Sequence, residues 1–577
     1  MVPSACTICG AGCGLLATVD RETSAVLGVQ GNPQHPGSQG RLCAAGLASA
    51  DLLRHPGRIL YPLRRKGERG EGRWERVSWE EALDEIANRM RETIQAERLH
   101  EIVVHLGQPE ADATTLEAIR AWGLDALATD TTAGSPHAGL GTALWCGSDR
   151  QGVDLEHARV ILLVGSPRDG SPLLPDPRKI LAARRRGAKV IVVSPTVTPL
   201  CALADLHLMP MPGTESVVLL AIAHHLVRTR AINRSFMQRW WNWQEYMEAR
   251  YPGMTMSFPR FELALQKLYA HYTPEFAEKE CAIPAADLSQ AAEWVAGAGT
   301  ALAAWCGGAC VEGNLGGWQT ARATFLLPAL LGAVGTEGGV SPGAWWRFLP
   351  ASPRSVPPTD LWNTLLWPGE FPLAWGTSSP LLPHLLRDGR GQLSVYLADR
   401  FDPVGQGPDG FSWIEALTDT ARVGLFAVLT PTWTPTAWYA DLVLPVGFDL
   451  ERHGLVSAET HDAHWLGLQQ PVVRAARASQ GSASEDSRKT NPGQVWEEAE
   501  FWIHLAWRLD PQGEWGIREA FESRQYPGER VGLEEHYNTL LERNVPDLSD
   551  TASQATLEVL RSYLRMEPPP RRHKRRR

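Results

Sequence analysis

The sequence has no run that approaches the ~20 uninterrupted apolar residues that a helix needs to cross a bilayer, which predicts no membrane span. It also lacks an N-terminal leader in which basic residues precede an apolar segment. The pair Arg64-Arg65 lies in a polar stretch with no apolar segment behind it, so a twin-arginine export signal is not expected. These absences predict a cytoplasmic protein or the cytoplasmic-side part of a larger complex.

Positive charge is scarce outside one short segment. The formal net charge is -9, and residues 571–577 carry six positive charges, which leaves about -15 on the rest of the chain. Attraction to phosphates needs a basic surface, so nucleic acid is excluded as a main partner. The basic tail is interpreted as a solvated end, with docking to an acidic partner as the alternative.

Disulfide-type cysteine usage is absent as well. The nine cysteines are an odd number, and four of them crowd near the N-terminus, which indicates a metal site rather than a disulfide framework. The length of 577 residues favours ~3 to 4 domains. With 44% hydrophobic and 21% charged residues, the composition is that of an ordinary globular protein.

The N-terminal cysteines have the spacing C-x2-C-x3-C-x29-C, formed by Cys6, Cys9, Cys13 and Cys43. The first three lie in a glycine-punctuated loop that can aim three thiolates at one centre. Structural zinc sites usually take their ligands as two short pairs, so this spacing favours a [4Fe–4S] cluster, with zinc as the alternative. Apolar stretches at 15–19 and 25–29 flank a polar turn and predict a small hairpin beside the site.

Alternating strand and helix patterns follow the cysteine region. Residues 160–164, 177–186 and 190–193 predict a βαβ unit with parallel strands, because buried parallel strands are unbroken Val/Ile/Leu runs. A second such region is expected at 394–397, 412–417, 423–429 and 442–444. The predicted fold class is α/β: a small N-terminal hairpin domain followed by two doubly wound, Rossmann-like αβα regions. Ligands in such sheets bind at the carboxyl ends of the strands.

An ordered set of short motifs resembles the molybdopterin oxidoreductases, from Cys6 to about Trp507. After the cysteines come residues 58–64 (RILYPLR) and 79–83 (WEEAL), and then the strand and turn at 158–167. Further pieces are similar to the family's later signatures, at 187–195, 204–215, 434–437 (TPTA), 440–445 (ADLVLP) and 451–454 (ERHG). Each piece is weak by itself, but their order is specific.

The resemblance implies a [4Fe–4S] cluster beside a bis(molybdopterin guanine dinucleotide) centre with molybdenum or tungsten. Backbone N–H groups at strand-to-helix turns suit a polyanionic dinucleotide, and an acidic side chain at a loop end can accept from the exocyclic amine of guanine. The cofactor-binding residues implied in this way are Gly165, Ser166, Ser194, Pro212, Gly213, Thr214, Glu215, Thr434 and Thr436. Ordinary βα-turn chemistry is the alternative for these turns.

Four departures from the family pattern bear on mechanism. Ala45 stands where many members have a lysine or arginine between the cluster and the pterin, which removes electrostatic tuning. Ser135 aligns with the position of the protein ligand to the metal, with a plain turn as the alternative. His137 beside it is a candidate proton donor, and a structural histidine is the alternative. Ser194 and Pro167 replace an aspartate and an asparagine that are usual in the family.

The fourth departure is the C-terminal cap domain, for which the sequence has no recognisable counterpart. The expected domains are a cluster domain at 1–62, a discontinuous αβα domain at 63–130 and 345–470, and a dinucleotide-binding domain at 131–344. A polar excursion, helices and the basic tail follow at 471–577. The polar stretch 478–493 is expected to lie on the surface.

Two functional hypotheses follow. In the first, the chain is the large subunit of an oxidoreductase whose partners are an electron-transfer iron–sulfur subunit and a separate cap-domain chain, acting on a small molecule such as formate. In the second, the chain is a non-catalytic homologue that keeps the cluster for electron transfer or scaffolding in a respiratory-type complex. Family members on this scaffold act on unrelated small molecules, so the sequence does not name the substrate.

Overall fold

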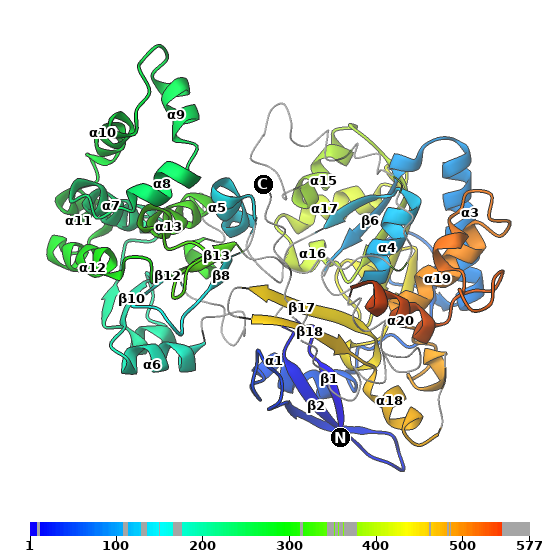
Figure 1. Cartoon of the computed structure of the whole chain (residues 1–577). Coiled ribbons are helices and arrows are strands. Elements are labelled where there is room, and N and C mark those ends of the chain that lie inside the picture. The colour runs from blue at the N-terminus through cyan, green and yellow to red at the C-terminus, as the bar shows by residue number, and fades with distance from the viewer. Residues whose placement is uncertain are drawn as a thin grey trace. The chain divides into compact units, whose positions relative to one another are not determined.

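A computed structural model of the chain describes residues 1–8, 12–107, 113–128, 136–148, 151–165, 176–311, 316–342, 378–460, 463–481 and 486–544, together with Ala351, Val356, Trp362 and Ser484. The chain divides into two units (Figure 1). Unit 1 consists of Met1–Ala133, Arg347–Ser457 and Trp465–Arg577, and unit 2 of Gly134–Trp346 and Ala458–His464. Within the described ranges, no helix has the length and apolar character needed to cross a membrane.

The N-terminal part of unit 1 is a three-stranded antiparallel sheet in the order β1-β2-β3. Its strands are β1 (Val2–Ala5), β2 (Gly14–Val19) and β3 (Val26–Gly31). The short helices α1 (Ala44–Leu47) and α2 (Ser49–Leu52) follow it. The two apolar stretches on either side of the polar turn therefore form the predicted hairpin, β2 and β3.

Unit 1 is built around a seven-stranded sheet in the order β5-β4-β16-β15-β14-β6-β7. The parallel strands are β6 (Ile102–Leu106), β7 (Asp125–Ala128), β14 (Leu393–Asp399), β15 (Val423–Thr430) and β16 (Leu442–Pro445). The hairpin of β4 (Leu63–Arg65) and β5 (Trp74–Arg76) adds an antiparallel edge. The predicted second αβα region is confirmed by β14, β15 and β16.

Helices cover both faces of this sheet (Figure 1). α15 (Ser378–Arg387) and α17 (Gly410–Thr418) pack through Leu382 and Trp413 on one face, against Val103, Tyr396 and Phe426 of the strands. The other side carries α3 (Trp79–Gln95), α4 (Ala113–Trp122) and α19 (Glu498–Leu509). α3 begins at a capping box formed by Ser78 and Glu81.

Unit 2 is built around a parallel sheet in the order β11-β10-β9-β12. Its strands are β9 (Val160–Val164), β10 (Lys189–Val193), β11 (Leu206–Leu208) and β12 (Leu302–Cys306). Alternate residues of β9 enter two cores, one with α7 (Glu215–Arg228), α12 (Ala285–Ala298) and α13 (Gly317–Leu331), the other with α6 (Pro177–Arg185). A strand buried on both faces must be apolar throughout, and β9, α6 and β10 confirm the predicted βαβ unit.

The remaining elements complete the two units. Unit 2 also contains α5 (Pro136–Cys146), β8 (Gln151–Val153), α8 (Arg234–Trp240), α9 (Trp243–Arg250), α10 (Phe258–Tyr269), α11 (Pro274–Cys281) and β13 (Val340–Pro342). The chain continues with α16 (Pro403–Gln406), β17 (Gly454–Thr460), β18 (Ala463–Gln469), α18 (Val472–Ala478) and α20 (Leu533–Asn544). β17 pairs with β18, and β8 pairs with β13 in antiparallel fashion.

The stretch 478–493 is not simply a surface excursion, and that expectation is corrected for its second half. Ser487 and Asn491 are buried. Ser487 donates from its hydroxyl to the carboxylate of Glu500 on α19, and its backbone N–H donates to the same group over 3.1 Å. The polar composition of this stretch predicts an exposed segment. The acceptor of Ser487 is Glu500 on a later helix, so the local composition does not indicate that Ser487 is buried.

Candidate functional site

The cofactor residues that were predicted in unit 2 lie at one edge of its sheet. Gly165 follows β9, Ser194 follows β10, and the segment from Pro212 to Glu215 leads from β11 into α7. The strands are parallel, so these positions share the carboxyl edge, where ligands of doubly wound sheets bind. The structure thus brings together residues from three separate stretches of the sequence.

Gly165 lies where two strand ends approach each other closely. Its φ of +89° is in the left-handed region, and its N–H donates to the Val193 carbonyl over 2.7 Å. A Cβ at this position would come within 2.0 Å of the Gly307 carbonyl oxygen and 3.1 Å of the Cys310 Cβ. Both the conformation and the space require glycine here.

Glu215 is the first residue of α7 and is only 1% exposed. Among the described residues, none forms a hydrogen bond with its Oε2. The thiol of Cys310, just after β12, lies beside it: burial raises the pKa of Cys310 well above its ordinary value, and the charge of Glu215 and a hydrogen bond to it raise it further. A buried carboxylate oxygen without a donor is costly, and a ligand that carries N–H groups would satisfy it.

The other predicted residues at this edge hold the turns themselves. Ser194 is fully buried and donates from Oγ to the Thr196 carbonyl over 2.8 Å. Thr214 donates from its hydroxyl to the Met211 carbonyl over 2.7 Å. Pro212 and Gly213 are exposed, and Gly213 has a φ of +89°. The backbone of this turn is open to solvent, whereas the Ser194 hydroxyl is used within its own turn.

In unit 1, Thr434 and Thr436 lie in the segment that follows β15. Thr436 is fully buried, and its hydroxyl donates to Asp402 Oδ1 over 2.7 Å and accepts from the Val404 N–H over 3.1 Å. Thr434 is half-buried and accepts the Ala437 N–H over 3.1 Å. These contacts tie the segment after β14 to the segment after β15 at the carboxyl edge of the unit 1 sheet.

The described N-terminal cysteines lie at the ends of the loop that connects β1 with β2 and at the start of α1. Cys6 and Cys13 are buried, and the Cys6 N–H donates to the Cys13 carbonyl over 2.8 Å. Cys43 caps α1, and its sulfur accepts the Gly46 N–H over 3.5 Å. Cys9 lies outside the described residues. Among the residues described, no three His, Cys, Asp or Glu side chains form a metal-binding group by themselves.

Residues of unit 1 that lie far along the chain form hydrogen bonds with β1 and with the start of the cysteine loop. Ser4 donates from its hydroxyl to the Gln470 carbonyl over 3.0 Å and accepts the Gln470 N–H over the same distance. Thr7, the residue after Cys6, donates from its hydroxyl to Gln469 Oε1 over 2.9 Å. Both contacts are buried, so they fix the position of β1 and of the start of the cysteine loop.

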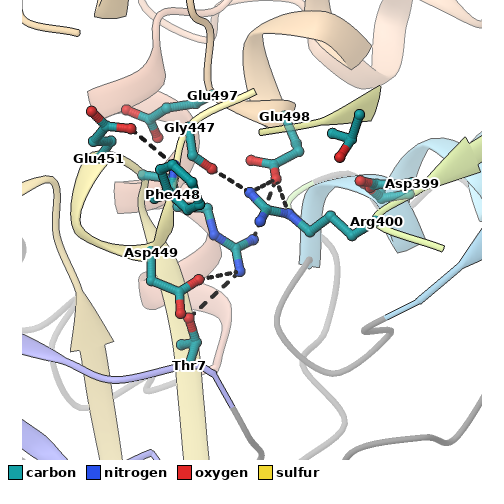
Figure 2. A network of polar contacts seen from close by, with 12 residues as sticks. Thr7, Asp399, Arg400, Gly447, Phe448, Asp449, Glu451, Glu497 and Glu498 are labelled. Atoms are coloured by element: carbon teal, nitrogen blue, oxygen red, sulfur yellow. Dashed lines mark hydrogen bonds and ion pairs between the residues drawn. The ribbon is translucent and has the colours of Figure 1, made fainter. Parts of the chain in front are cut away.

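Two guanidinium groups, the buried one of Arg452 and the partly buried one of Arg400, belong to the polar network around Thr7 (Figure 2). Arg452 contacts Thr7 Oγ1 at 3.5 Å, Asp449 at 3.1 Å and Glu498 at 3.6 Å. Arg400, which follows β14, forms an ion pair with the same Glu498 and donates to the Gly447 carbonyl. Figure 2 shows the guanidinium group of Arg400 turned toward Glu498. Buried charges persist only when they are paired in this way.

A second buried ionic group lies beside the first and was not found from the sequence. His453 and Arg474 contact the two oxygens of Glu497 at 3.0 and 2.6 Å. Burial raises the pKa of Glu497, but Arg474 and His453 outweigh it and bring that pKa to about 2. The motif at 451–454 marked His453 by resemblance, but no local pattern connects it with a carboxylate 44 residues later.

Glu500 is an acid of this region whose pKa is raised. Burial, and then the charge of Glu497, raise its pKa to about 7. A carboxyl whose pKa is higher in the folded chain than in the unfolded one binds its proton more tightly when folded, so the free energy of unfolding falls as pH rises from about 4.5 to about 7.

Glu500→Gln is expected to remove this pH dependence. Between pH 5 and pH 7.5 the free energy of unfolding of the wild-type chain should fall by about 2 kcal/mol through Glu500. The variant should not show this fall, because its amide does not ionise. Urea denaturation at the two pH values measures the difference. Glu92→Gln, at an exposed position of α3, serves as the control and should retain the wild-type slope. An equal slope in Glu500→Gln would contradict the assignment.

The predicted metal-ligand region is described only in part. Ser135 and Ser166 lie outside the described residues. His137 lies in the first turn of α5, and its side chain also lies outside the description. The roles given to these three residues therefore stay predictions.

Comparison with known families identifies the family to which a chain with these two sheet edges and this cysteine loop belongs. The family model for molybdopterin oxidoreductases matches residues 58–480, and the model for the molybdopterin oxidoreductase Fe4S4 domain matches residues 1–55. The chain belongs to the molybdopterin oxidoreductase family. The first match covers most of the sheets of both units, and the second covers the hairpin with Cys6, Cys13 and Cys43.

Individual relatives are distant. The alpha subunit of an F420-dependent formate dehydrogenase from Methanococcus maripaludis is 26% identical over 480 residues, which cover 78% of this chain and 64% of that protein. The periplasmic nitrate reductase of Desulfovibrio desulfuricans is 26% identical over 489 residues, which cover 79% of this chain and 61% of that protein. The chain thus spans less than two thirds of the length of these relatives.

A solved structure supports the fold of this molybdopterin oxidoreductase chain. Acetylene hydratase from Pelobacter acetylenicus superposes with a TM-score of 0.70 at 19% identity, covering 90% of this chain and 70% of that one. The match confirms the α/β class with the N-terminal hairpin. At this identity it carries the fold and no chemistry.

The family's cofactors are a molybdopterin and a [4Fe–4S] cluster, and this chain offers a fitting environment for each. For the cluster, Cys6 and Cys13 would supply buried thiols from the two ends of one loop, with Cys43 at the N-cap of α1. For the molybdopterin, unit 2 has a sheet edge where a side chain is excluded at Gly165 and where the Glu215 carboxylate has an unsatisfied oxygen. Gly165 and Glu215 were predicted from the sequence, but the contact of Glu215 with Cys310 was not.

Proposed function

We propose that this chain is the large subunit of a molybdenum- or tungsten-pterin oxidoreductase that takes electrons from a small substrate and passes them through one [4Fe–4S] cluster to partner subunits. The observation that carries the proposal is the buried oxygen of Glu215 at the carboxyl edge of the unit 2 sheet, which no described residue satisfies with a hydrogen bond. An edge that had lost its ligand would gain stability by replacing this carboxylate with an apolar side chain.

Within this proposal, the residues of unit 2 bind and orient the cofactor. Glu215 accepts N–H groups of a base, and the exposed backbone of Pro212 and Gly213 faces the anionic part of a dinucleotide. Gly165 allows close approach at the end of β9. The bound molybdenum or tungsten supplies the two-electron exchange with the substrate. We assign the candidate proton transfer to His137 and the metal-ligand position to Ser135.

In unit 1, the cysteines bind the cluster and the network of Figure 2 fixes its surroundings. Cys6, Cys9, Cys13 and Cys43 are the proposed ligands. Thr7 joins the cysteine loop to Gln469 and to the buried Arg452. Ala45 on α1 is exposed and uncharged, so it brings no positive charge to the cysteine loop. The loop instead contacts a cation through Thr7, which accepts a hydrogen bond from the buried guanidinium of Arg452.

Relatives suggest the substrate class and the partners. The formate dehydrogenase relative is an alpha subunit, and we propose formate as the first substrate to test, followed by oxoanions and sulfur compounds. We further propose an electron-transfer iron–sulfur subunit and a separate cap-domain chain as partners. A cytoplasmic location stays a prediction, since one relative is a periplasmic nitrate reductase.

A non-catalytic role for the same chain is the second candidate, and a specific observation favours it. Ala45 brings no charge to α1, and Ser194 uses its hydroxyl on Thr196 rather than on a ligand. Both features suit a chain that keeps the cluster and has lost the metal–pterin centre. The two functions differ in composition and can be separated without knowledge of the substrate.

The deciding experiment is the metal and pterin content of the full chain, purified with its native partners under anaerobic conditions. The oxidoreductase should contain about four iron atoms and about one molybdenum or tungsten per chain. Acid extracts should yield a pterin guanine dinucleotide. Intact iron with no molybdenum, tungsten or pterin would overturn the catalytic proposal and favour the electron-transfer role.

A further inference from the structure

A cysteine and a histidine meet at the turn that follows β10 in unit 2. Cys201 lies on the short 3-10 helix Pro199–Leu203, and His207 lies on β11. The Sγ of Cys201 is 3.5 Å from His207 Nε2. Cys201 is half-buried, so reagents can reach the thiol.

The imidazole directs an N–H toward this sulfur. His207 Nε2 is also 3.2 Å from the carbonyl oxygen of Ser194. A carbonyl oxygen only accepts hydrogen bonds, so the hydrogen of the neutral ring lies on Nε2. The same N–H therefore faces both the Ser194 carbonyl and the Cys201 sulfur.

Thr198 adds two more polar groups around the sulfur. Its backbone N–H donates to Cys201 Sγ over 3.3 Å, and its hydroxyl lies 3.5 Å from the same atom. A thiolate accepts hydrogen bonds more strongly than a thiol, so donors that converge on sulfur stabilise the thiolate. The thiolate is the nucleophilic form of cysteine.

Other cysteines of unit 2 have different surroundings. The Cys146 thiol donates to the carbonyls of Thr142 and Ser148 at 3.4 and 3.8 Å, and such acceptors favour the protonated form. The Cys201 thiol has one acceptor of this kind, the Thr196 carbonyl at 3.8 Å, beside the closer groups of His207 and Thr198. Cys281 is buried, and burial raises its pKa. Burial also raises the pKa of Cys306 to about 12. Cys146 is half-buried like Cys201, so it is the matched internal reference.

We propose that Cys201 is a nucleophilic thiol and a modification site for soft electrophiles and hydroperoxides, activated by His207 and Thr198. With iodoacetamide, an S–C bond forms, the C–I bond breaks and iodide leaves. With hydrogen peroxide, the thiolate attacks one oxygen, the O–O bond breaks and hydroxide leaves. The sulfur is oxidised by two electrons to a sulfenic acid, and the peroxide is reduced.

The location gives the modification a consequence. His207 connects the sulfur to the carbonyl of Ser194, at the end of β10. A group added to the sulfur competes with this hydrogen bond and disturbs the turn between β10 and β11. This inference concerns the thiol itself and holds whether or not the metal–pterin centre is present.

The test is site-resolved alkylation of the full, cluster-loaded chain with iodoacetamide at pH 7 under anaerobic conditions. Peptide mass spectrometry follows each cysteine separately. Cys201 should react at least about tenfold faster than Cys146, and Cys281 and Cys306 should react more slowly still. Equal rates at Cys201 and Cys146 would overturn the proposal.

Variants test the two activating residues. His207→Leu removes the imidazole donor and should slow Cys201 about tenfold, whereas His225→Leu, at a half-buried position on α7, should leave the rate unchanged. Thr198→Val removes the hydroxyl and keeps the backbone N–H, so it should slow Cys201 to a smaller extent. If His207→Leu fails to fold, the Thr198→Val rate still decides. An unchanged Cys201 rate in a folded variant of both positions would refute the activation.

Discussion

Cys13→Ala is expected to abolish the [4Fe–4S] cluster, with iron falling from about four atoms per chain to near zero, or to convert it to a three-iron species. Cys13 is buried at the end of the hairpin, and its carbonyl accepts the N–H of Cys6. Alanine keeps this backbone contact and removes the ligand sulfur, so the loss is one of coordination rather than of folding. Iron analysis and the EPR spectrum of the reduced protein measure it.

A matched variant separates ligand loss from a general effect of removing a buried thiol. Cys281→Ala deletes a buried sulfur in unit 2 and should leave iron content and EPR spectrum as in the wild type. Cys9→Ala should behave like Cys13→Ala. An unchanged spectrum in Cys13→Ala would show that the proposed ligand set is wrong.

Gly165→Ala is expected to destabilise unit 2 by several kcal/mol and to lower its pterin content. The added Cβ would lie 2.0 Å from the Gly307 carbonyl oxygen, so the ends of β9 and β12 would have to separate. The left-handed backbone, with a φ of +89°, adds a strain of about 1–2 kcal/mol. Urea denaturation reports the stability, and acid extraction reports the pterin.

Gly187→Ala is the control for backbone strain. Gly187 has a φ of +99°, but a Cβ there would meet nothing within 4 Å. This variant should lose about 1–2 kcal/mol through conformation and no pterin. If the two alanine variants prove equally stable, the close approach at Gly165 has no energetic weight.

The fold was largely predictable because its strands are distinct apolar runs. Residues 160–164 and 190–193 became β9 and β10, and 423–429 became most of β15. Short turns at the ends of such runs indicate the carboxyl edges, and Gly165 and Glu215 lie at that edge of the unit 2 sheet.

The contacts between distant segments could not be predicted. The pairing of Arg474 with Glu497, and the sharing of Glu498 by Arg400 and Arg452, connect residues that no local period relates. Polar residues in a sequence indicate a surface by default, and burial of an ion pair depends on which segments pack together. The second half of 478–493 was misjudged for the same reason.

The support of the N-terminal hairpin sets the order in which the chain can mature. Ser4 and Thr7 are synthesised about 460 residues before Gln469 and Gln470, the residues that bind them. At typical synthesis rates this delay is roughly 20 to 90 seconds. During that interval the hydrogen bonds that fix Ser4 and Thr7 cannot form. A cluster inserted early would therefore be bound by thiolates of a loop that is not yet fixed in position. Completion of the metal site is thereby linked to synthesis of the segment with Gln469 and Gln470, and a chain that lacks this segment is the form most exposed to loss of iron.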